Sequence, residues 1–140
     1  MISLEIKENS KIVNEMNKYL DGITIEGLLM VLMEMKGTFH FQVMFSEEQM
    51  REDVAVMDLS QRAINCLRRS GINTVGQLVK SFHTKEGETS KKQLRKLRNL
   101  GQNTADDILI KLFFHQFTVL SENRRKSYMD NVLEINGIAA

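Results

Sequence analysis

The chain of 140 residues contains no proline, and this absence constrains its fold more than any other single feature. Turn-rich β architectures depend on proline and glycine, whereas only 8 glycines are present. Apolar patterns that no proline interrupts can continue as helices until a glycine or a capping residue ends them. The sequence therefore predicts a mainly α protein with a minor two-stranded β element.

The composition is that of a globular protein with an aliphatic core. Hydrophobic residues make up 42% and charged residues 26% of the sequence, and tryptophan is absent. The single cysteine excludes an intrachain disulfide and agrees with a reducing compartment. The longest apolar run, 28–33, is far shorter than the roughly 20 residues of a membrane helix. With no apolar segment near residue 1 either, we expect a cytoplasmic protein.

Residues 1–46 predict a small β-α-α-β module. Residues 2–6 alternate between apolar and polar side chains, as does "TFHFQVMF" at 38–45, so each predicts a half-buried strand. Between them, 9–20 and the segment after the cap Thr24 predict two helices, the second apolar on nearly every side. A two-stranded sheet is marginal alone, so the module either forms a homodimer or caps the rest of the protein.

The remaining residues, 47–140, predict a helical bundle. Capping residues and glycines divide it into short helices, followed by a long helix over 103–119. The expected N-caps are Ser46, either Asp58 or Ser60, Thr74, Ser90 and Ser121. Gly71 is expected to end the helix over 60–70, and Gly137 the last one.

The charge distribution is uneven. Residues 58–103 carry ten lysines and arginines against three acidic residues, a net charge of +7, whereas the remaining residues together carry −6. A basic centre of this kind suits a face that binds a polyanion. The alternative is that the lysines of 85–96 belong to a solvated loop.

The predicted helix over 60–70 has an apolar and a polar side. Its apolar stripe, spaced for one helical face, consists of Leu59, Ala63, Ile64 and Leu67. Arg62, Asn65 and Arg69 fall on the opposite side, with Cys66 beside them. Asn65 is therefore expected to point outward between two arginines, an arrangement suited to a phosphate or a nucleic-acid groove.

A second pattern lies at 97–108, "LRNLGQNTADDI". Gly101 permits a close backbone approach between two helices, and the second helix starts within 102–104. The N–H groups of Gln102, Asn103 and Thr104 then have no partner within the helix and lie at its positive end, where phosphates bind. The pattern is that of a helix-hairpin-helix motif.

Together, "DLSQRAINCLRRSGINTVGQLV" and "LRNLGQNTADDILIKL" resemble the C-terminal domain of the bacterial RNA polymerase alpha subunit, over about 56–120. The resemblance implies a helix-hairpin-helix fold that binds the minor groove of A/T-rich DNA and contacts transcription activators. It assigns the family's key arginine to Arg62 and its Asn-Cys pair to Asn65 and Cys66. It also assigns the hairpin glycine to Gly101, the helix-start hydroxyl to Thr104 and the acidic position to Asp107. The expected DNA-binding residues are Arg62, Asn65, Cys66, Arg69, Arg98, Gly101, Gln102, Asn103, Thr104 and Asp107.

The sequence also departs from that family. A lysine or arginine is usual at the position of Gln102 or Asn103, so one or two phosphate contacts are missing. Arg98 and its neighbours Arg95 and Lys96 are expected to compensate in part for this loss of charge. The loop over 82–93 is longer than usual. Residues 1–50 do not resemble the assembly domain of the alpha subunit, so we expect a separate small protein that uses the DNA-binding domain.

Two functions follow as hypotheses. The first is a DNA-binding, transcription-associated protein, and the alternative is a module that docks on RNA polymerase or a regulator with weak or no DNA binding. We do not expect an enzyme, because the three histidines are scattered without carboxylates or cysteines at ligand spacing. Asp106 and Asp107 suit the start of a helix better than a metal site. No metal or cofactor is expected.

Overall fold

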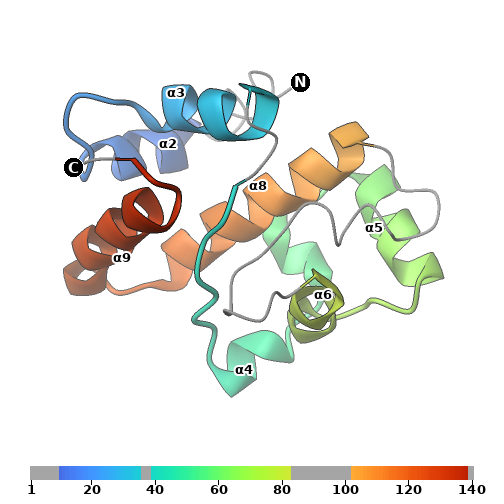
Figure 1. Cartoon of the computed structure of the whole chain (residues 1–140). Helices are drawn as coiled ribbons and strands as arrows, with labels where there is room; N and C mark the ends of the chain where they lie inside the picture. Colours follow the sequence, from blue (N-terminus) through green and yellow to red (C-terminus); the bar gives the residue numbers. More distant parts are fainter. Residues whose placement is uncertain (1–9, 36–38, 83–101, 139–140) are drawn as a thin grey trace.

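The structure, a computed structural model, describes residues 10–35, 39–82 and 102–138, and it confirms the prediction of a mainly α protein (Figure 1). The elements in sequence order are α2 (Ser10–Asn17), α3 (Ile25–Leu29), the π-helix η1 (Met30–Met35), α4 (Glu47–Met50), the 3-10 helix η2 (Val54–Met57), α5 (Gln61–Arg69), α6 (Val75–Phe82), α8 (Gln102–Val119) and α9 (Glu122–Ile135). None of the described helices is long and apolar enough to cross a membrane.

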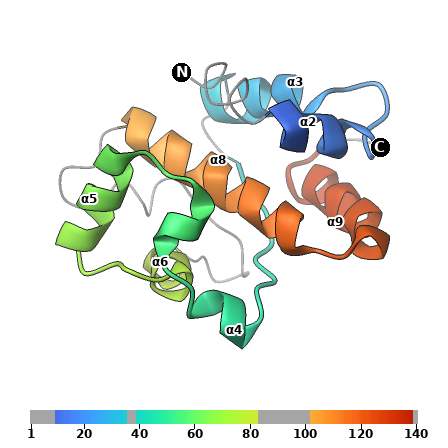
Figure 2. The same ribbon diagram turned by 180° about the vertical axis from the view of Figure 1, so that it is seen from behind.

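Helix α8 runs through the centre of the molecule. Figures 1 and 2 show α5, α6 and α4 around one part of α8, and α9, α2 and α3 around its C-terminal part. The predicted stripe of α8 is buried as expected, with Ala105, Ile108, Leu109, Leu112 and Phe113 fully buried. However, every residue over 105–114 is buried, including Lys111. Because neighbours cover α8 on all sides, its sequence need not show a single apolar face.

The N-terminal helices form as the sequence predicts. Val13 and Met16 of α2 are buried, and Thr24 caps α3 by accepting a hydrogen bond from the N–H of Gly27 at 3.1 Å. Asn17 ties the two helices together, because its Oδ1 accepts from the N–H of Ile25 at 2.7 Å. The second apolar helix continues beyond Leu29 as η1.

The predicted sheet is not found among the residues that the structure describes. The first strand, 2–6, lies outside the described residues, and 39–45 is extended but forms only an isolated bridge at Gln42. Phe39 and Phe41 are nonetheless buried as predicted, with ring centroids 5.0 and 5.2 Å from that of Phe113. Within 39–45 the predicted strand is therefore corrected to an extended segment that packs on α8, and residue 38 lies outside the described residues.

Side chains of α8 and of the α9 region pair with the backbone of this extended segment. The Asn136 amide accepts from the N–H of His40 at 2.9 Å and donates to its carbonyl at 2.7 Å. Two further bonds follow along the segment: the Tyr128 hydroxyl donates to the Gln42 carbonyl at 2.8 Å, and Gln116 Oε1 accepts from the N–H of Met44 at 2.5 Å. Side-chain groups here do what a neighbouring strand does in a sheet.

The two predicted units contribute to one hydrophobic core. Val13, Leu28 and Phe41 from 1–46 belong to the same buried cluster as Leu109 and Val132 from 47–140. The division after residue 46 therefore stays a prediction about organisation, and it does not separate two cores.

Candidate nucleic-acid interface

Helix α5 begins at a serine cap. Ser60 Oγ accepts a hydrogen bond from the N–H of Ala63 at 3.1 Å, so of the two expected caps Ser60 serves α5. Asp58 instead ends η2 in a left-handed conformation, with φ of 55°. The turn at Asp58 therefore separates η2 from α5.

The C-terminal end of α5 is a Schellman motif centred on Gly71. Its N–H donates to the carbonyl of Arg68 at 3.0 Å, and that of Ile72 donates to the carbonyl of Leu67 at 2.8 Å. Gly71 has φ of +79°, which a residue without a Cβ adopts easily. The predicted end of the helix is confirmed, and the backbone turns at once towards α6.

The two faces of α5 are those that its sequence predicts. Ala63 and Leu67 are fully buried, while Arg62, Asn65 and Arg69 are exposed. Asn65 therefore points to solvent, where its Oδ1 accepts from Gln61 Nε2 at 2.9 Å. No hydrogen bond or ion pair among the described residues involves the side chain of Arg62 or Arg69. Both guanidinium groups can therefore contact an anion from outside the protein.

Cys66 is placed differently from the prediction that it lies on the binding face. It is only 5% exposed and belongs to the hydrophobic core beneath α5. Its thiol is therefore not part of the exposed stripe, because Cys66 lies on the buried side of the helix next to Leu67.

The third arginine of this region, Arg68, has an internal partner that sequence reasoning missed. Its guanidinium donates to both carboxylate oxygens of Asp53, at 3.0 and 3.2 Å, and to Asn73 Oδ1 at 3.1 Å. The Arg68 hydrogen bond, followed by that from the N–H of Ala55, lowers the pKa of Asp53. The sequence around Asp53 indicates only that this residue can cap η2, and it does not indicate that Arg68 is its partner.

The start of α8 lies beside α5 in both views (Figures 1 and 2). The helix begins at Gln102, as predicted, so the N–H groups of 102–104 belong to its first turn. Thr104 is partly exposed, whereas Asp107 is buried at 8% exposure. Arg98, Gly101 and the predicted short helix after Ser90 lie outside the described residues.

The histidines do not assemble a metal centre in the described part of the protein, where no group of three His, Cys, Asp or Glu side chains lies close enough to hold an ion. His115 packs against Phe45, with ring centroids 5.5 Å apart, and burial lowers its pKa. His40 lies on the extended segment, and His83 is outside the described residues.

These features define a small helical module whose exposed cationic helix packs beside the start of a central helix. The protein belongs to the family of the C-terminal domain of the bacterial RNA polymerase alpha chain, whose model matches residues 44–113. The match includes α4, η2, α5 and α6 and ends within α8, so α2, α3 and α9 lie outside it.

Several DNA-directed RNA polymerase alpha subunits are similar to this part of the sequence. That of Carboxydothermus hydrogenoformans is 38% identical over 71 residues, covering 47% of this chain, and that of Leifsonia xyli subsp. xyli is 42% identical over 71 residues, covering 51%. That of Desulforudis audaxviator is 28% identical over 96 residues, covering 64%. The chain spans only 20%, 18% and 28% of these three relatives' own lengths. No solved structure matches it.

Proposed function

We propose that this protein is a transcription-associated DNA-binding module that acts in the bacterial cytoplasm and contacts the minor groove of A/T-rich duplexes. The observation that carries the proposal is the exposed pair Arg62 and Arg69, whose side chains have no partner among the described residues, beside the start of α8. Family membership supports this use of the surface, since the relatives are subunits of RNA polymerase.

Each group has a chemical task in this proposal. Arg62 enters the minor groove, because a narrow A/T groove concentrates negative potential and attracts a guanidinium. Asn65 and Arg69 contact the flanking sugar-phosphate backbone. The N–H groups of Gln102 to Thr104 hold a phosphate at the positive end of α8, with the Thr104 hydroxyl beside them.

The other predicted residues take supporting roles. By the resemblance, Gly101 allows the close approach of the hairpin to DNA, and Arg98 adds a phosphate contact. Cys66 and Asp107 are buried, so in this proposal they position α5 and α8 and do not touch DNA directly.

Fluorescence anisotropy with a labelled A/T-rich duplex and a matched G/C-rich duplex tests this function at 50 and 200 mM salt. We expect preference for the A/T duplex and about 5- to 150-fold weaker binding by Arg62→Ala, since a well-placed groove contact contributes about 1–3 kcal/mol. Lys126→Ala, on α9 at the other end of the molecule, is the charge-matched control and should bind like the wild type. Equal binding by wild type and Arg62→Ala would contradict the proposal.

A second candidate is a module that docks on RNA polymerase or a transcription regulator with little DNA affinity. The neutral residues Gln102 and Asn103 at the start of α8 favour it, because they remove charges that would neutralise phosphates. Capture of purified RNA polymerase on the immobilised protein after nuclease treatment tests this function. Retention after nuclease supports docking, whereas loss of all captured polymerase contradicts it.

We also propose a homodimer through residues 1–46. Met30 of η1 is 50% exposed, a large apolar side chain next to the buried Leu29. Light scattering should give twice the monomer mass of 16.1 kDa for the wild type and the monomer mass itself for Met30→Lys. A wild-type mass of 16.1 kDa at all concentrations would contradict the dimer.

A further inference from the structure

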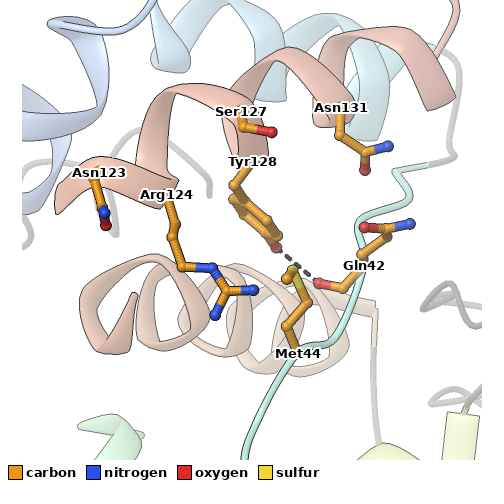
Figure 3. Close-up of a pocket in the computed structure, with 7 residues that line it drawn as sticks. All are labelled: Gln42, Met44, Asn123, Arg124, Ser127, Tyr128 and Asn131. Atoms are coloured by element: carbon orange, nitrogen blue, oxygen red, sulfur yellow. Dashed lines mark hydrogen bonds between the residues drawn. The ribbon is translucent and has the colours of Figure 1, made fainter. Parts of the chain in front are cut away.

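A groove that is unrelated to the α5 surface lies between the extended segment and α9 (Figure 3). Its volume is about 280 Å³, room for on the order of nine water molecules. Gln42 and Met44 line one side, and the other side is lined by five residues of α9, Asn123, Arg124, Ser127, Tyr128 and Asn131. Apart from Met44, these residues lie outside 44–113, so the groove is not part of the region that matches the polymerase family.

The groove carries a positive charge, which favours an anionic ligand. Arg124 lines it, and among the described residues no acidic side chain does. The two neighbouring cations of α9 are occupied: Arg125 lies 3.9 Å from Glu15 and 4.5 Å from the Phe117 ring centroid, and Lys126 pairs with Asp130 at 2.9 Å. Within the described part of the protein, no hydrogen bond or ion pair involves the side chain of Arg124. Its guanidinium points towards Met44 (Figure 3).

One residue that lines the groove lacks a hydrogen-bond donor. Asn131 Oδ1 is buried and has no hydrogen-bond partner among the described residues. The Tyr128 hydroxyl cannot supply it, because that group donates to the Gln42 carbonyl. A buried acceptor left without a donor costs about 1–3 kcal/mol, so a ligand N–H that reaches it gains affinity.

Carboxamides already bind extended backbone in this region. Asn136, further along the same helical segment, pairs with both the N–H and the carbonyl of His40. Asn131 presents the same kind of group to the groove. An extended peptide that carries an acidic side chain supplies both groups, a backbone N–H for Asn131 and a carboxylate for Arg124.

We propose that this groove binds an acidic peptide segment of a partner protein, with a glutamate or aspartate carboxylate on Arg124 and a backbone N–H on Asn131 Oδ1. Met44, which is 40% exposed, packs on the methylene groups of the bound side chain. Nucleic acid suits the groove less well, because one cation and a buried acceptor cannot neutralise successive phosphates.

Chemical-shift titration of the full ¹⁵N-labelled protein tests this site with the blocked peptide acetyl-Ala-Glu-Ala-amide. Its glutamine counterpart, acetate, inorganic phosphate and an A/T-rich DNA duplex are titrated in parallel. We expect saturable shifts over 42–44 and 123–131 with the glutamate peptide and at least tenfold weaker binding of the glutamine peptide. Arg124→Ala should weaken binding of the glutamate peptide at least tenfold, and Asn131→Ala should weaken it severalfold.

Two control variants distinguish binding at this groove from an effect of net charge and from binding at the α5 surface. Lys126→Ala removes one positive charge from the same helix outside the groove, and Arg62→Ala removes one from α5, so both should bind the peptide like the wild type. Equal binding of both peptides, or of wild type and Arg124→Ala, overturns the proposal. Acetate or phosphate that binds as well as the peptide identifies a plain anion site and also overturns it. Displacement of the peptide by the duplex shows a nucleic-acid site instead.

Discussion

The guanidinium of Arg68 holds the carboxylate of Asp53 through two hydrogen bonds, 3.0 Å to Oδ1 and 3.2 Å to Oδ2. The pair connects the C-terminal turn of α5 to the residue that caps η2, and Asn73 Oδ1 accepts a third bond from the same guanidinium. Arg68 thus links α5 to the start of η2, whereas Arg62 and Arg69 on the same helix have no such partner in the described residues.

This difference predicts that two arginine substitutions separate stability from binding. Arg68→Ala should lower the melting temperature by about 1–3 °C, because a half-exposed ion pair is weak. Arg62→Ala should leave the melting temperature unchanged while weakening DNA binding about tenfold. Differential scanning calorimetry and fluorescence anisotropy on the same preparations check both. A larger loss of stability for Arg62→Ala would show that its side chain is structural.

The stability of the protein should depend on pH through His115. Burial lowers the pKa of His115 below its ordinary value of 6.5, and the charge of Glu52 opposes this shift only in part. Below pH 6.5 the unfolded state therefore binds a proton at this residue that the folded state does not, so the free energy of unfolding falls as the pH falls. Asp58 and Lys111 are the charged residues that line the same pocket as His115.

Urea denaturation of the wild type and His115→Gln between pH 7 and pH 5 measures that effect. The wild type should lose stability over this range more steeply than the variant, because glutamine does not titrate. Identical slopes would show that another group causes the pH dependence.

Two glycines should respond in opposite ways to alanine. Gly71→Ala should cost about 1 kcal/mol, because its φ of +79° is unfavourable for a residue with a Cβ. Gly27→Ala should stabilise α3 by about 0.5–1 kcal/mol, since its Cβ would meet only Thr24 Oγ1, at an ordinary 3.4 Å. Chemical denaturation of the two variants shows whether each substitution lowers or raises the free energy of unfolding. A stabilising Gly71→Ala would be incompatible with the Schellman motif.

A third glycine determines how closely two helices pack. A Cβ on Gly76 of α6 would lie 2.9 Å from the carbonyl oxygen of Met50 at the end of α4, and this backbone atom cannot rotate away. Gly76→Ala should therefore cost about 1–3 kcal/mol by overpacking. Denaturation midpoints measure the loss, and an unchanged midpoint would mean that α4 and α6 separate easily.

The extended segment should depend on Asn136. Asn136→Ala removes two hydrogen bonds to the backbone of His40 and one to the Val132 carbonyl, so it should cost about 2–4 kcal/mol. Glu134→Ala, an exposed residue of the same helical turn, is the control and should stay within about 0.5 kcal/mol of the wild type. Amide hydrogen exchange at residues 39–45 should be faster in Asn136→Ala than in the wild type, and it should be unchanged in Glu134→Ala.

Features that depend on neighbouring residues could be predicted from the sequence. Thr24, Ser60, Thr74 and the Ser46–Gln49 capping box act as caps because a cap needs only a backbone N–H two or three residues away. One case differs: Ser121 precedes α9, but its hydroxyl bonds to Asn123 and does not cap the helix. The exposed side of α5, with Asn65 between two arginines, was predictable for the same local reason, because helical periodicity decides it.

Other features depend on residues that are far apart in the sequence. The alternation in 38–45 correctly predicted that Phe39 and Phe41 are buried, but it could not show that Asn136, some 96 residues away, would replace a neighbouring strand. The pairing of Arg68 with Asp53, across 15 positions, left no periodic pattern either.

The sequence by itself determined which segments become helices, where most of them start and end, and which side of α5 faces solvent, because these outcomes follow from local hydrogen bonds and helical periodicity. Only the tertiary structure decided that α8 is buried on every side, that Cys66 lies in the core and that Arg68 is internally paired. It also formed the groove between α9 and the extended segment. These features arise when distant segments pack together and leave each side chain a particular set of neighbours.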